Sequence, residues 1–115
     1  MLKEAYLEGV AHSARDYLAA RELQGALAGG LNAVFDRYDA IITPSAIGEA
    51  PDGIGATGTA VFNALWTFVG APCVNLPVAK GSKGLPLGVQ VVGRPGEDAR
   101  LLRTARWVEG RLAGN

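Results

Sequence analysis

The first third of the chain carries apolar residues at helical spacing. Leu2, Tyr6 and Val10 recur at helical spacing before Ser13 and Asp16. This pair has the spacing of a capping box, in which a hydroxyl and a carboxylate satisfy free amides at a helix start. After the cap, apolar positions recur with a period of about 3.6 residues. They are Ala14, Tyr17, Leu18, Leu23, Leu27, Leu31, Val34 and Phe35. We therefore predict a short helix, a break at Ser13 and a long helix to about residue 36, which can bend or split at Gly29-Gly30.

The next segment predicts a strand and a loop. Residues 40–43 are a β-branched run stopped by Pro44, which is typical of a short buried strand. Residues 45–57 are rich in glycine and proline and therefore predict a loop. Two interpretations of this loop stay open, since it either borders a pocket or only crosses the surface.

A third helix is predicted to start at Thr57 or Thr59 and to run to about Val69. Gly70 suits the left-handed position that ends many helices, and Pro72 prevents continuation.

The remaining pattern predicts two strands and a closing helix. Residues 73–78 and 87–92 are apolar with little alternation, as expected for strands covered on both faces. Their short connection favours an antiparallel pair, because a parallel crossover needs a dozen or more residues. The closing helix begins near Glu97 and Asp98, and its apolar stripe comprises Leu101, Leu102, Ala105, Val108 and Leu112. Residues 1–115 therefore predict a single α/β domain or fragment, with a partial mixed β-sheet of at least three strands flanked by helices.

Composition narrows the class of protein. Eleven basic and eleven acidic residues cancel, which gives no electrostatic footprint for nucleic acid or an anionic membrane. No apolar run approaches the ~18–20 residues needed to span a bilayer. The single cysteine, Cys73, cannot form an internal disulfide, so a cytoplasmic location is expected.

Residues that carry chemistry are sparse. His12 is the only histidine, and a surface or capping role is favoured over a metal or catalytic one. Cys73 opens an apolar strand, where a thiol is usually an inert core residue. The serines, none of them in a nucleophile-elbow context, are Ser13, Ser45 and Ser82. We therefore predict no catalytic residue, no metal and no cofactor within this chain.

A series of short motifs, in order and spacing, resembles the C-terminal part of the amidase signature family. In chain order they are Arg37-Tyr38-Asp39-Ala40-Ile41-Ile42-Thr43-Pro44, Ala50-Pro51, Thr57-Gly58, Phe62-Asn63, Trp66-Thr67, Gly70-Ala71-Pro72, Leu76-Pro77 and Gly84-Leu85-Pro86-Leu87-Gly88-Val89-Gln90. The resemblance covers nearly the whole chain. Ser45 replaces the threonine that is usual after the Thr-Pro pair, and Trp66-Thr67 looks more like the general amidases than the tRNA amidotransferases.

The resemblance implies hydrolysis or transfer of amide C–N bonds by a Ser–cis-Ser–Lys triad. This chain has no Ser-Ser pair and no Gly-Gly-Ser segment, and Lys3, Lys80 and Lys83 do not fit the family's lysine context. None of the family's catalytic residues can therefore be assigned here. By resemblance, the candidates that line the substrate pocket are Thr57, Phe62 and Trp66. The alternative is that Phe62 and Trp66 are core residues on an apolar helix face.

Three interpretations of the function remain. The chain is a piece of a longer amide hydrolase, a small subunit that completes a split amidase, or a non-catalytic oligomerising interaction domain. The expected partners are correspondingly a missing N-terminal amidase half or a second copy of the chain. A small amide substrate is expected only in a complete enzyme. Strands covered on both faces need more cover than this chain provides, so self-association is expected when it is alone.

Overall fold

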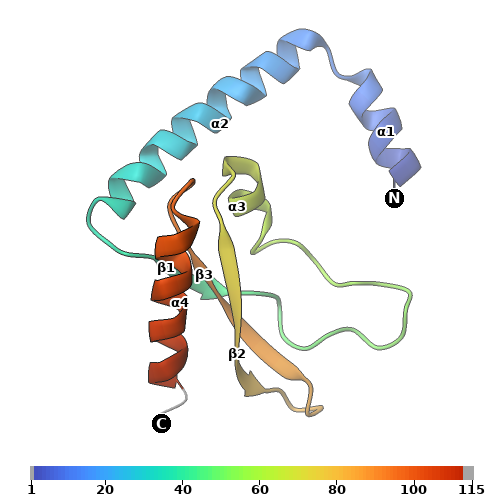
Figure 1. Cartoon of the computed structure of the whole chain (residues 1–115). Helices are drawn as coiled ribbons and strands as arrows, with labels where there is room; N and C mark the ends of the chain where they lie inside the picture. The colour runs from blue at the N-terminus through green and yellow to red at the C-terminus, as the bar shows by residue number, and fades with distance from the viewer. Residues whose placement is uncertain (1, 113–115) are drawn as a thin grey trace.

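The computed structural model describes residues 2–112 as four helices and three strands (Figure 1). In chain order they are α1 (Leu2–Ala11), α2 (Ala14–Phe35), β1 (Ile41–Pro44), α3 (Ala64–Val69), β2 (Cys73–Lys80), β3 (Pro86–Val92) and α4 (Asp98–Leu112). The predicted order of helices and strands is confirmed, and so is the α/β class.

The three strands form one sheet in the order β1-β3-β2, with β3 in the middle. Both pairings are antiparallel, which confirms the predicted β2–β3 pair. A mixed sheet was expected, but the described strands contain no parallel pairing. The reason is topological: β1 and β2 run in the same direction, and β3 lies between them.

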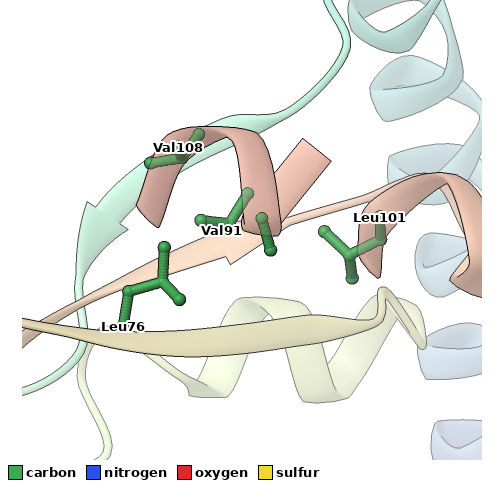
Figure 2. Close-up of a cluster of buried hydrophobic side chains, with 5 residues drawn as sticks. Leu76, Val91, Leu101 and Val108 are labelled. Carbon is green, nitrogen blue, oxygen red and sulfur yellow. The ribbon is translucent and has the colours of Figure 1, made fainter. Parts of the chain in front are cut away.

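One face of the sheet packs against α4. The buried cluster comprises Leu76 of β2, Val91 of β3, and Leu101, Ala105 and Val108 of α4 (Figure 2). The fit is close, because a Cβ added at Gly93 would lie 2.9 Å from the Cβ of Leu101. Burying a side chain of this size contributes ~1.5–3 kcal/mol. Leu102, Leu112 and Trp107 stay exposed, so the stripe that α4 buries is narrower than the sequence predicts.

The opposite face of the sheet is covered only at one end. Trp66 of α3, Phe35 at the end of α2 and Val92 of β3 form a second buried cluster there. Cys73 and Asn75 of β2 are exposed. The prediction that both strands are covered on both faces is therefore right for the end of β3 and wrong for β2. The cover is incomplete because α3 has only six residues.

Helix α3 is shorter than predicted. It begins after Asn63, and neither Thr57 nor Thr59 caps it. The residues before it form a loop and a turn in which the Ala60 carbonyl accepts from the amides of Asn63 and Ala64. Its end is as predicted, since Gly70 has φ 69° in the left-handed region.

Helix α1 and the N-terminal part of α2 extend away from the sheet, whereas the C-terminal part of α2 packs against α3 (Figure 1). The capping box is confirmed: the Asp16 amide donates to the Ser13 hydroxyl at 3.1 Å, and the Ser13 amide donates to the Asp16 carboxylate at 3.1 Å. Helix α2 stays continuous through Gly29-Gly30. Many of its apolar side chains and those of α1 nevertheless face solvent. They include Tyr6, Leu7, Val10, Tyr17, Leu18 and Leu23.

The overall dimensions reflect the exposed surface of α1 and α2. The radius of gyration is 17.0 Å, whereas a compact domain of this length has a radius of about 13 Å. The accessible surface is 8566 Å², and a folded monomer of this mass exposes about 6,000 Å². About 2,600 Å² of surface is therefore exposed beyond what a compact domain of this mass leaves open.

Candidate functional site

The loop between β1 and α3 encloses a hollow against the sheet. Its volume is about 490 Å³. The walls come from residues 45–51 and 57–59 of this loop, from Asn75 of β2, and from Pro86 and Gly88 at the start of β3. The loop therefore borders a pocket, which is the first of the two interpretations that the sequence left open.

The three predicted pocket residues occupy different places. Thr57 lies in the wall of the hollow. Trp66 does not, since its side chain is 8% exposed and belongs to the core beneath α3. Phe62 is partly buried outside the hollow. The geometry thus fits a core role for Trp66, and contact of any of the three with a substrate stays a prediction.

Ser45 and Asn75 form a polar pair in the wall that the sequence did not reveal. The Ser45 hydroxyl donates to the side-chain carbonyl of Asn75. The Ser45 amide also donates to the Gly88 carbonyl at 3.1 Å. Gly88 leaves room for this pair, because an added Cβ would lie 2.4 Å from the Asn75 side-chain oxygen and would displace it. Two features of the sequence could have indicated this pair: Ser45 directly follows Thr-Pro, and Asn75 is a polar residue within an apolar strand.

Gln90 holds the base of this region together. It is 4% exposed on the central strand. Its side-chain amide donates to the Pro44 carbonyl at 3.1 Å and to the Phe62 carbonyl at 2.7 Å. Gln90 thereby joins the end of β1 to the segment before α3. Both N–H donors of its buried side chain are paired, as expected of buried polar groups.

Glu49 connects the loop to the hairpin between β2 and β3. Its carboxylate accepts from the amides of Lys83, at 3.0 and 3.1 Å, and Leu85, at 2.8 Å. The Ser82 hydroxyl donates to the same carboxylate at 3.4 Å. These bonds, chiefly that from the Lys83 amide, lower the pKa of Glu49 below its usual value. Nothing in the local sequence predicts this contact between segments more than thirty residues apart.

The other reactive side chains do not form a site with each other. His12 is exposed at the corner between α1 and α2. Cys73 is exposed on β2, which corrects the expectation that it is a core residue, and partial burial raises the pKa of its thiol. Over residues 2–112, no cluster of three or more His, Cys, Asp and Glu side chains is arranged to hold a metal ion. None of the described helices is long and apolar enough to cross a bilayer.

Comparisons with known proteins identify the family of this chain. The sequence model of the family "Amidase" matches residues 2–102. A solved crystal structure of an amidase superposes with a TM-score of 0.82 at 31% sequence identity, covering 96% of this chain and 28% of that one. The chain belongs to the amidase family, as its motifs indicate.

The similar relatives include two kinds of enzyme. A glutamyl-tRNA(Gln) amidotransferase subunit of Rickettsia bellii is 35% identical over 103 residues, which is 81% of this chain and 20% of that protein. The fatty acid amide hydrolase of Medicago truncatula is 33% identical over 114 residues, 89% of this chain and 19% of that protein. The fatty acid amide hydrolase of Arabidopsis thaliana is 36% identical over 109 residues, 84% of this chain and 18% of that protein. The chain thus spans about a fifth of the length of these relatives.

Proposed function

We propose that this chain supplies part of the substrate-binding region of an enzyme that hydrolyses amide C–N bonds, and that it has no such activity alone. The observation that carries the proposal is the hollow, whose wall includes Ala50-Pro51 and Thr57-Gly58, two of the motifs that this chain shares with amidases. Support also comes from the superposition on a solved amidase.

The lining of the hollow suits part of a small neutral amide. Ile47, Pro51 and Pro86 offer apolar contact, and Thr57 and Asn75 offer polar groups that can orient a ligand. Among the described residues, Glu49 is the one charged residue that lines the hollow, and its carboxylate is bonded to the hairpin amides of Lys83 and Leu85, so it is not free to select a charged substrate. By resemblance to the family, in which this region forms walls of the acyl pocket, we expect the hollow to receive the acyl side of the amide.

Catalysis needs groups that this sequence does not contain. Amide hydrolysis requires an activated nucleophile, a proton acceptor and donors for the oxyanion. The chain has no Ser-Ser pair, and its only histidine lies at the α1–α2 corner, outside the hollow. The nucleophile and base are therefore proposed to come from the remainder of an amidase domain, joined to this chain or separate from it.

The uncovered surface is proposed as the docking site for that remainder. About 2,600 Å² is exposed in excess, whereas each partner of a standard interface contributes only about 800 Å². Exposed apolar side chains lie along α1 and α2, among them Tyr6, Leu7, Val10, Tyr17, Leu18 and Leu23. The similar relatives are about five times as long as this chain, so a domain of their kind has ample material to cover it. A cytoplasmic location is proposed because the neutral chain has one unpaired, exposed thiol.

The test is complementation. The purified chain is mixed or co-expressed with the remaining part of an amidase of this family, and turnover is measured on a panel of aryl and aliphatic amides. We expect no turnover from the chain alone and clear turnover from the assembly. Leu23→Asp on the exposed face of α2 should weaken complementation, and Arg103→Ala, at an exposed position of α4, serves as the surface control.

Two results would contradict the proposal. The first is turnover by the chain alone that Ser45→Ala or Ser82→Ala abolishes, since it would reveal a self-contained site. The second is a stable homodimer that does not bind the amidase remainder at all. That outcome would favour the non-catalytic oligomerising domain.

A further inference from the structure

We infer that Glu49 is a positioning residue that fixes the wall of the hollow by clamping its loop onto the β2–β3 hairpin. The inference rests on the proposed function only in taking the hollow as a binding pocket. The clamp itself is a property of this chain and can be measured without a substrate.

The bonding pattern around Glu49 is that of an anchor. One carboxylate receives two backbone amides and one hydroxyl, all from the hairpin residues Ser82, Lys83 and Leu85. Hydrogen bonds to an ionised acceptor are stronger than those between neutral groups. The hairpin has also left space for the carboxylate, because a Cβ added at Gly81 would lie 2.2 Å from the Glu49 carboxyl carbon. Only glycine at residue 81 permits this approach without a shift.

The part of the wall formed by residues 45–49 is held at both of its ends. At one end Ser45 is bonded to Gly88 and to Asn75. At the other end Glu49 is bonded to the hairpin, and residues 46–48 of the wall lie between these two attachments. Gly48 has φ 71°, a conformation that lets the loop turn just before Glu49. Without Glu49, residues 46–48 would be attached at the Ser45 end and, beyond Glu49, only through the exposed pair of Asp52 with Lys83.

The charged groups facing Glu49 are Lys83 on the hairpin and, beside it, Asp52 on the loop. The Lys83 ammonium pairs with Asp52 at 2.7 Å. This pair is a second link between the same segments, but both side chains are largely exposed, so it should contribute little. The two links can therefore be separated by mutation, with Asp52→Asn as the matched control for Glu49→Gln.

Hydrogen exchange on the full chain tests the clamp. We expect Glu49→Gln to lower severalfold the protection factors of the Lys83 and Leu85 amides, which donate to the Glu49 carboxylate. Protection of β3 and α4 should be unchanged, which shows that the fold is intact. Asp52→Asn should leave all these values near those of the wild type. Equal protection in Glu49→Gln and wild type, or an equal loss in Asp52→Asn, overturns the inference.

Acid provides a second readout that a general loss of stability would not reproduce. The pKa of Glu49 is lower in the clamped loop than in a free one, so clamping favours the ionised form. Protection of the Lys83 and Leu85 amides, corrected for intrinsic exchange, should therefore persist above the usual glutamate pKa of about 4.3 and fall below it. In Glu49→Gln this acid dependence should be absent. Identical pH profiles in both proteins would also overturn the inference.

In the complemented enzyme, the clamp should act on substrate binding. Glu49→Gln is expected to raise KM for amides that fill the hollow while kcat changes little. A complementation assay with no turnover in any variant counts against the proposed function alone. An exchange experiment with no difference between variants counts against the clamp alone.

Discussion

Replacing Leu101 with alanine should show how much of the stability of the sheet comes from its packing against α4. Leu101 is 3% exposed and lies in the cluster with Leu76, Val91 and Val108. Leucine-to-alanine changes at such sites cost ~2–5 kcal/mol, depending on how far the cavity collapses. The cluster lies between a single helix and a sheet, so some collapse is possible. We therefore expect Leu101→Ala to lower the free energy of unfolding by about 3 kcal/mol, or roughly 150-fold in the equilibrium constant.

The neighbouring residue is the matched control. Leu102 is on the same helix and is 61% exposed, so Leu102→Ala should change stability by less than ~0.5 kcal/mol. Urea unfolding followed by far-UV circular dichroism compares the two variants. With a slope of about 2 kcal/mol/M, Leu101→Ala should shift the midpoint down by about 1.5 M. If it does not fold, Leu101→Val provides a milder step in the same direction. Equal shifts for residues 101 and 102 would refute the assignment of the core.

Three further predictions concern polar contacts and assembly. Gln90→Ala should lower the free energy of unfolding by about 1–3 kcal/mol in urea titrations, because it leaves two backbone carbonyls without their donor. An unchanged free energy of unfolding would mean that those carbonyls are in contact with water instead. Sedimentation of the chain alone should show concentration-dependent self-association that Leu18→Asp weakens, since Leu18 is 61% exposed on α2; a concentration-independent monomer contradicts this. The pKa of Asp16 is lowered by its hydrogen bonds with Ser13, so its contribution to the stability of α2 is present above the usual aspartate pKa and is lost on further acidification. Circular dichroism should therefore show a loss of helicity at acid pH in the wild type. This loss should be absent in Ser13→Ala.

Local signals explain what the sequence predicted correctly. The cap at Ser13 and Asp16 involves residues three apart, and Gly70 ends α3 by its own backbone conformation. The order of helices and strands likewise follows from periodicity along the chain. The start of α3 was missed because Thr57 and Thr59 have the right residue type for a cap, but the glycine-rich loop before them is held to the hairpin instead.

Long-range contacts explain what the sequence could not reveal. An apolar period in α2 indicates which side of the helix is apolar, but not whether anything within the chain covers that side. Ser45 and Asn75 meet across 30 residues, and Glu49 meets Leu85 across 36. A role for Trp66 in a pocket and a role in the core both predict an aromatic residue on the inner face of a short helix. Only the fold distinguishes these two roles.

The position of β3 has a consequence for synthesis on the ribosome. Within residues 2–112 the central strand of the sheet is the last one in sequence, so β1 cannot pair with β3 until residue 92 has emerged. Closing the loop between β1 and β3 costs more entropy than closing the β2–β3 hairpin, because the loop is much longer. The hairpin and α4 should therefore assemble first, and β1 should add to them afterwards. Until then Phe35 at the end of α2 also lacks Val92, with which it is buried in the folded chain, and an exposed apolar side chain is the kind of surface that molecular chaperones bind.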